Sequence, residues 1–156
     1  MSFGQLSVKG RALRYLAQRE HSRLELERKL ARHVQDTAEQ SAGEQIAQAL
    51  DALAAADLQS ETRVAESVLR CQGARFGGLK LRQTLQAKGL EPGLVSDTLQ
   101  LARATESERA LAVWQRKFGA PPADAQAKAR QHRFMASRGF SSEVVRRIVQ
   151  GVEDDD

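Results

Sequence analysis

Two stretches, LQAKGL at residues 85–90 and MASRGF at residues 135–140, decide the fold. Each places a large apolar residue, a cation, a glycine and a second apolar residue at the same spacing. A glycine in this setting is typical of a left-handed helix C-cap, where a side chain would clash with the backbone. The pair therefore predicts one helix–turn–helix unit used twice. Leu30 with His33-Val34 is a weaker copy without glycine.

Helix signals surround these turns. Ala, Leu, Gln, Glu, Lys and Arg dominate the composition, as in helical proteins. Ser22-Arg23-Leu24-Glu25 has the capping-box pattern, in which the serine and the glutamate satisfy each other's backbone N–H groups. Residues 34–43 are polar and without period, which predicts a loop. Other helix starts are expected at Ser60, Pro92, Thr105-Glu106-Ser107-Glu108 and Ser141.

The chain of 156 residues is predicted to be all-α, with three tandem three-helix, helix-turn-helix-like repeats in an elongated, curved array. An aromatic content of 4% with three prolines disfavours a β-sandwich or barrel. A repeat of about 40–50 residues has little core of its own, so neighbouring repeats should pack on one another. The predicted segments are a tail at 1–8, repeats at 9–58, 59–104 and 105–151, and an acidic tail at 152–156.

Charge alternates along the chain although the net charge is only +4. Residues 70–90 carry five basic residues and no acidic one, and residues 109–147 carry nine basic and two acidic residues. Residues 36–69, in contrast, carry one basic and seven acidic residues. This recurrence indicates either a basic strip or ordinary solvated helix faces, and both interpretations stay open here.

The basic clusters are the candidate binding site. They could contact phosphates or an acidic protein groove. The alternative is that they serve solubility and offset helix dipoles, which suits Lys88 and Arg138 at helix ends. The candidate contact residues are Arg28, Arg32, Arg70, Arg75, Lys80, Arg82, Lys88, Lys128, Arg130 and Arg133.

No convergent catalytic set is visible, so we expect no enzyme, no cofactor and no metal. The three histidines are far apart, outside known zinc spacings, and are expected at the surface or in caps. Cys71, the one cysteine, excludes an internal disulfide and is expected to be buried. Trp114 and Tyr15 are assigned to the core, and the glycines at 77 and 78 to a helix–helix turn.

At this point the residues resemble the RecX family of recombinase regulators. The opening ALRYLAQREHSR at 12–23, followed by ELERKL at 25–30, is similar to the family's N-terminal signature. TRVAES at 62–67 resembles the start of its second repeat, with Val64 where an aromatic residue is usual. FG at 76–77 with LRQTLQAKGL at 81–90 resembles its central helix pair. KAR at 128–130, FM at 134–135 and RGF at 138–140 resemble its C-terminal repeat.

The resemblance implies three tandem three-helix repeats that bind RecA filaments on DNA and lie in the filament groove. It implies suppression of ATP hydrolysis, strand exchange and coprotease activity, and thus a role in recombination, DNA repair and the SOS response. The implied partners are the RecA filament and the single- or double-stranded DNA within or near it. The Arg75–Lys88 and Lys128–Arg133 clusters are then the predicted contacts.

An alternative function is direct DNA binding, because three-helix units with short turns resemble helix-turn-helix modules. A third possibility is an adaptor for another acidic helical protein. We expect a cytoplasmic protein, because a single cysteine fits a reducing compartment, no apolar stretch is long enough to span a membrane, and the start at Met1–Gly4 lacks the long apolar centre of a signal peptide. We also expect a monomer. Residues 153–156 are expected to be disordered, and either to aid solubility or to screen a basic strip.

Overall fold

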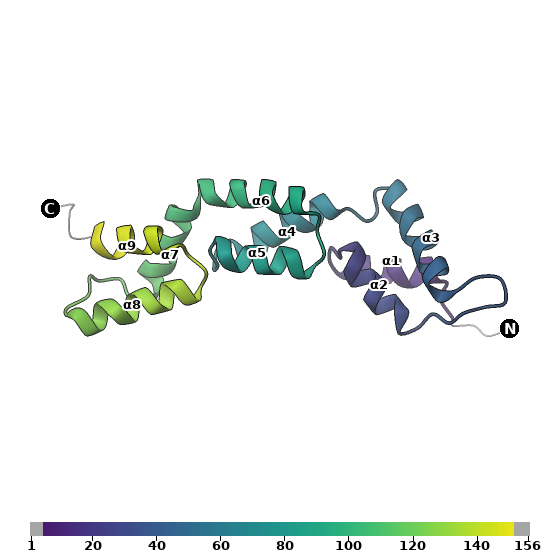
Figure 1. Ribbon diagram of the computed structural model, residues 1–156, viewed down its shortest axis with the longest axis horizontal. Helices are drawn as coiled ribbons and strands as arrows, with labels where there is room; N and C mark the ends of the chain where they lie inside the picture. The colour runs from purple at the N-terminus through teal and green to yellow at the C-terminus, as the bar shows by residue number, and fades with distance from the viewer. Residues whose placement is uncertain (1–4, 152–156) are drawn as a thin grey trace. The chain divides into compact units, whose positions relative to one another are not determined.

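The computed structural model describes residues 5–151, and all regular structure in that range is helical (Figure 1). The all-α fold class is therefore confirmed. Residues 1–4 and 152–156, which hold the acidic tail, lie outside the described range. The helices are α1 (Val8–Gln18), α2 (Arg23–Ala31), α3 (Ala42–Ala55), α4 (Glu61–Gln72), α5 (Gly78–Ala87), α6 (Pro92–Ala104), α7 (Glu106–Lys117), α8 (Ala125–Ser137) and α9 (Ser142–Gly151).

Short polar residues fix several helix starts, mostly as predicted. The capping box at Ser22 and Glu25 is present, and Pro92 opens α6. A second box joins Ser41 and Glu44, so α3 begins at Ala42 and the predicted loop ends earlier than expected. The capping box predicted at Thr105 is wrong: its side chain makes no cap hydrogen bond, because Thr105 also ends α6 and its backbone is not extended.

Glycines end helices where the turn stretches predicted it. Gly89 and Gly139 have φ values of 74° and 87°, and Gly119 after α7 has 70°. These values lie in the left-handed region that side-chain-bearing residues avoid. The predicted glycine C-caps are confirmed.

By its contacts the chain divides into two compact units. The first unit consists of the residues up to Ala65 together with Lys88–Leu90, and the second consists of Glu66–Ala87 and the residues from Glu91 onward. The predicted boundaries of the three repeats stay predictions, although α1 begins one residue inside the predicted tail.

The first unit has a core formed by one face each of α1, α2 and α3. The buried side chains recur at the three- and four-residue spacing of amphipathic helices. His21 is also fully buried, which corrects the expectation of a surface histidine. The core residues are Ala12, Leu26, Leu30, Ile46, Leu50 and Leu53.

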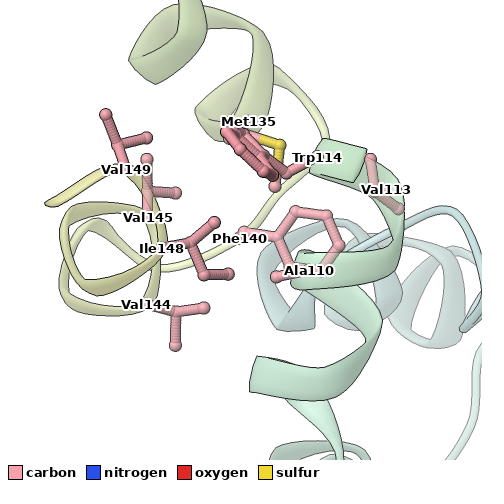
Figure 2. Close-up of a cluster of buried hydrophobic side chains, with 9 residues drawn as sticks. All are labelled: Ala110, Val113, Trp114, Met135, Phe140, Val144, Val145, Ile148 and Val149. Carbon is pink, nitrogen blue, oxygen red and sulfur yellow. The ribbon is translucent and has the colours of Figure 1, made fainter. Parts of the chain in front are cut away.

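In the second unit, α7, α8 and α9 enclose a cluster around Trp114, Met135 and Phe140 (Figure 2). The Trp114 indole N–H donates to Gln131 Oε1 at 2.8 Å, so the buried ring keeps its polar group satisfied. Trp114 is in the core as predicted. Cys71 is exposed on α4, so the prediction that it is buried was wrong.

Candidate functional site

Two junctions in the molecule have the same construction. At each, a glutamate from the first turn of one helix accepts a hydrogen bond from the free backbone N–H groups at the start of another. Glu61 Oε1 on α4 accepts from Arg23 N of α2 at 2.7 Å, and Glu106 Oε1 on α7 accepts from Gly78 N of α5 at 3.3 Å. A carboxylate placed there also complements the helix dipole. We call these sites the α2 junction and the α5 junction.

Each junction is completed by one of the glycine turns. A Cβ on Gly89 would lie 2.7 Å from Leu24 Cδ2, and a Cβ on Gly139 would lie 2.6 Å from the backbone nitrogen of Lys80. At the α5 junction the residues that lead into α5 also pair with the Gly139 turn through the backbone. Gly77 N donates to Arg138 O at 2.8 Å, and Leu79 N donates to Gly139 O at 3.1 Å. The turn stretches therefore serve packing as well as helix termination.

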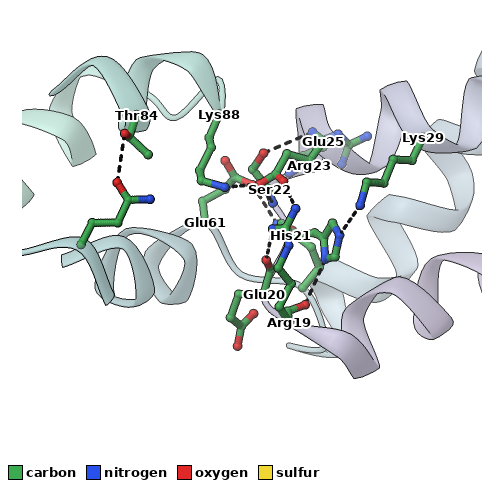
Figure 3. A network of polar contacts seen from close by, with 12 residues as sticks. Arg19, Glu20, His21, Ser22, Arg23, Glu25, Lys29, Glu61, Thr84 and Lys88 are labelled. Carbon is green, nitrogen blue, oxygen red and sulfur yellow. Dashed lines mark hydrogen bonds and ion pairs between the residues drawn. The ribbon is translucent and has the colours of Figure 1, made fainter. Parts of the chain in front are cut away.

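The α2 junction neutralises its cations with carboxylates (Figure 3). Glu25 accepts from Lys88 Nζ at 2.9 Å and from Arg19 Nη2 at 2.6 Å. Burial alone would raise the pKa of Glu25, but hydrogen bonds from Arg19, Lys88 and the Ser22 backbone outweigh it and lower the pKa from 4.5 to about 2. Glu25 is therefore ionised at neutral pH and holds two cations from different segments.

Arginines next to this junction are paired as well. Arg23 contacts Asp51 at 2.8 Å and Glu27 at 3.2 Å. Arg63 contacts Glu20 at 3.0 Å and Asp57 at 3.1 Å. These cations are already engaged within the protein and offer little charge to a partner.

His21 is buried beside the same network. Its Nδ1 lies 3.0 Å from Arg19 O and its Nε2 lies 2.8 Å from Lys29 Nζ. This arrangement assigns the proton to Nδ1, which donates to the carbonyl while Nε2 accepts from the ammonium group. Burial, with the charges of Arg19 and Lys29 adding to it, lowers the pKa of His21 below 6.5 despite the carbonyl contact. The ring is thus held neutral.

At the α5 junction the cations lie over phenylalanine rings instead of pairing with carboxylates. Arg75, Lys80 and Arg138 lie 5.3, 5.0 and 5.8 Å from the centre of the Phe76 ring. Arg138 and Lys117 lie 5.0 and 5.1 Å from the centre of the Phe134 ring. In the part of the chain that the structure describes, none of these four cations has a carboxylate within 4.0 Å. Within residues 5–151 no carboxylate neutralises their charge.

These stacked cations border a groove of about 280 Å³, which we call the cationic groove. It is formed by the α4–α5 loop, the end of α7 and the end of α8. Four of its six lining residues are cations, and the other two are apolar. The lining residues are Arg75, Val113, Arg116, Lys117, Phe134 and Arg138.

A larger pocket of about 490 Å³ lies in the second unit among α5, α6, α7 and α9. Its edge includes Arg82 and Arg103, and Leu79 beside them is 60% exposed. Arg109 in its wall is structural: it donates to the carbonyls of Gly73, Phe76 and Ala102, and burial lowers its pKa. We call this hollow the arginine pocket.

The structure places the predicted contact residues in different settings. Lys88 is held in the Glu25 ion pair, and Lys128 is half-buried on α8. Arg75 and Lys80 meet on Phe76, whereas Arg82 borders the arginine pocket. The exposed residues of the predicted set are Arg28, Arg32, Arg70, Arg75, Lys80, Arg82, Arg130 and Arg133.

Sequence reasoning missed most of the cationic groove. Arg116, Lys117 and Phe134 were not among the predicted contacts, because they come from segments distant in sequence from Arg75. The available signal was the spacing of Arg130, Phe134 and Arg138, which puts two cations and a ring on one face of α8.

No three histidine, cysteine or carboxylate side chains in residues 5–151 gather as a metal site. None of the described helices is long and apolar enough to cross a bilayer.

Comparison with known proteins identifies close relatives. Residues 104–149 match the family described as "RecX, third three-helix domain". The regulatory protein RecX of Leptothrix cholodnii is 51% identical over 94% of this chain and 89% of its own length. That of Ralstonia nicotianae is 45% identical over 95% and 89%. The crystal structure of RecX from Lactobacillus salivarius has the same fold, with a TM-score of 0.76, 22% identity and 94% of each chain covered.

Proposed function

The chain belongs to the RecX family of regulatory proteins, and we propose that it inhibits RecA by binding in the groove of the RecA–DNA filament. In this proposal it suppresses ATP hydrolysis, strand exchange and coprotease activity. The partners are RecA and the DNA that the filament holds. The protein acts in the cytoplasm as a monomer.

The observation that supports the proposal is the set of exposed cations in the second unit that have no carboxylate within 4.0 Å among the described residues. Arg82 and Arg103 line the arginine pocket with the exposed Leu79, while its two glutamates, at 106 and 143, are engaged by Gly78 N and Arg147. These two arginines and the leucine suit an acidic protein surface with an apolar side chain. Further cations lie exposed on α4 and α8. A filament repeats its surface, so several weak contacts of this kind add up multivalently.

Direct DNA binding is the alternative that the test must separate. Inhibition by protein contact should appear at substoichiometric amounts, while naked DNA is bound weakly. Inhibition by DNA competition should appear only once the DNA is coated, and it should weaken steeply with salt.

The experiment is a titration of this protein into RecA during DNA-dependent ATP hydrolysis, with naked-DNA binding measured in the same buffer. We expect Arg82→Glu with Arg103→Glu to require about tenfold more protein for half inhibition, since two lost surface ion pairs amount to roughly 1.4 kcal/mol. The matched control is Lys9→Glu with Arg14→Glu, two exposed cations of α1. Equal inhibition by both double variants, at unchanged helicity, contradicts the assignment of the arginine pocket.

A further inference from the structure

We propose that the cationic groove binds the sugar–phosphate backbone of a single DNA strand, with Arg75, Arg116, Lys117 and Arg138 contacting its phosphates. The site lies in the second unit and shares no lining residue with the arginine pocket assigned to protein contact. It reads charge and shape, and it is indifferent to base sequence.

The first step of the inference is the charge of the groove. Arg75, Lys117 and Arg138 have aromatic rings beneath them and, within residues 5–151, no carboxylate within 4.0 Å. Arg116 Nη2 donates to Ala74 O at 3.1 Å, which orients that guanidinium without neutralising it. Four like charges around about 280 Å³ repel one another, and an anion in the groove relieves that repulsion.

The second step is the hydrogen-bonding character of the lining. The side chains that line the groove are three arginines, one lysine, a valine and a phenylalanine, so they offer N–H donors and no acceptor. A deoxyribose–phosphate backbone carries acceptors only and matches this lining. A peptide has an N–H donor at nearly every residue, and these donors would face other donors. The groove therefore suits a DNA strand better than an acidic peptide.

The third step is shape. The guanidinium fork of arginine fits a phosphate through two parallel hydrogen bonds, and Arg75, Arg116 and Arg138 provide three such forks. Val113 and Phe134 form an apolar floor on which a deoxyribose can lie. The floor is unsuited to base stacking, because Lys117 and Arg138 lie over the Phe134 ring and the Phe118 ring packs perpendicular to it at 5.4 Å between centroids.

The cations also continue beyond the groove along α8. Arg130, Phe134 and Arg138 follow one another at four-residue spacing, so they share a face over about 12 Å of helix. Arg130 is exposed. A line of cations matches a polymer with a charge on every unit, as in proteins whose grooves track a nucleic-acid backbone.

The inference deepens the proposed function and rests on it only in that the bound strand would be the one in the filament. The first measurement therefore omits RecA. Fluorescence anisotropy of a labelled oligothymidylate of about 20 nucleotides is followed against concentration of the full-length protein at several salt concentrations.

We expect Arg75→Ala with Lys117→Ala to weaken oligothymidylate binding about tenfold. The slope of log affinity against log salt should become shallower by about 1.4, which is 0.7 for each of two lost phosphate contacts. Oligoadenylate and oligocytidylate should behave alike, because the bases are not read. Lys9→Ala with Arg14→Ala removes the same charge from α1 and should leave the slope unchanged.

Two further measurements keep the test decisive. Arg138→Lys keeps the charge but loses the fork, so it should weaken binding by a smaller factor without affecting folding. A polyglutamate peptide is the competing ligand. Loss of polyglutamate binding with unchanged oligonucleotide binding in the Arg75/Lys117 variant overturns the proposal in favour of an acidic peptide. Unchanged binding of both ligands overturns it as well.

RecA inhibition by the same variant separates this inference from the proposed function. Weakened oligonucleotide binding with full inhibition supports the groove as a DNA site and places the inhibitory contact elsewhere. Lost inhibition with full oligonucleotide binding overturns the groove as a DNA site while leaving the proposed function intact.

Discussion

The α2 and α5 junctions share a backbone design and differ in how they hold their cations. Both use a first-turn glutamate to cap a neighbouring helix and a left-handed glycine to allow close packing. Lys88 before Gly89 forms an ion pair with Glu25, whereas Arg138 before Gly139 stacks on Phe76 and Phe134. The cation before the turn glycine is thus already paired with a carboxylate at the α2 junction, whereas at the α5 junction it can bind an anion.

This difference shows that sequence charge alone does not locate a binding surface. In the first unit Arg19, Arg23 and Arg63 form ion pairs with carboxylates of the same unit. The second-unit cations on Phe76 and Phe134 keep their charge available, because an aromatic face attracts a cation without neutralising it.

The glycines at the junctions should give the largest effects on stability. A Cβ on Gly77 would lie 2.5 Å from the backbone of Gly139 and Phe140, so Gly77→Ala and Gly139→Ala should each cost about 3 kcal/mol. Gly89→Ala meets the Leu24 side chain instead and should cost about 2 kcal/mol. Urea unfolding measures all three. Gly43→Ala in α3 is the control and should be neutral or stabilising, and an equal loss there would refute the packing role.

The Glu25 network should make the first unit sensitive to acid. The folded-state pKa of about 2 lies below the unfolded value, so the stabilisation is present above about pH 4.5 and is lost as pH falls toward 2. Glu25→Gln keeps the capping box but loses both ion pairs, at a cost of about 2 kcal/mol at pH 7. Unfolding from pH 7 to 3 should show a smaller pH dependence in this variant. The same pH dependence as in the parent would contradict the assignment.

His21 should add a second, smaller pH dependence. Its folded-state pKa lies below 6.5, so the unfolded chain binds the proton more readily and stability declines as pH falls through 6.5. We expect a measurable loss of stability between pH 7.5 and 5.5, because burial disfavours the imidazolium and the Lys29 ammonium would face it. His21→Phe replaces the imidazole by a ring that does not titrate and should remove this decline. Persistence of the decline in that variant would assign it to another group.

The smallest stability effect is expected where the cations are stacked. Lys88→Met breaks the ion pair with Glu25 and should cost about 1.5 kcal/mol, while Arg138→Met should cost under about 1 kcal/mol. Anion binding should show the reverse order, since only Arg138 lines the cationic groove. Thermal unfolding and oligonucleotide anisotropy on both variants test whether the order of the two effects reverses between stability and anion binding. Parallel losses in the two assays would remove the distinction between the junctions.

The local signals in the sequence predicted much of the fold. Gly89 and Gly139 at helix ends and Pro92 at a helix start were correctly assigned, because each depends on the conformational limits of one residue type. Ser41 and Glu44 carry the same capping-box pattern as Ser22 and Glu25, so that start was also readable. The capping box predicted at Thr105 is wrong because this residue also ends α6, and its backbone there is not the extended one that an N-cap needs.

The candidate site was less predictable, because its residues meet only after packing. Nothing in the sequence near Lys88 shows that Glu25 is its partner, and nothing near Arg75 indicates Arg116 or Phe134. His21 reads as a polar surface residue, yet the carbonyl of Arg19 and the ammonium of Lys29 satisfy it inside the protein. Burial of polar groups depends on partners supplied by tertiary structure.

The backbone pairing of Gly77 and Leu79 with Arg138 and Gly139 has a consequence for folding. It joins the loop between α4 and α5 to the loop between α8 and α9, far along the chain, so we expect the described residues of the second unit to unfold as one cooperative block. A fragment ending at Ala104 would lack the acceptors for the amide hydrogens of Gly77, Gly78 and Leu79, and it would lack the Arg138 side chain that lies over the Phe76 ring. We therefore expect helices that the sequence assigns to separate repeats to behave as a single foldon.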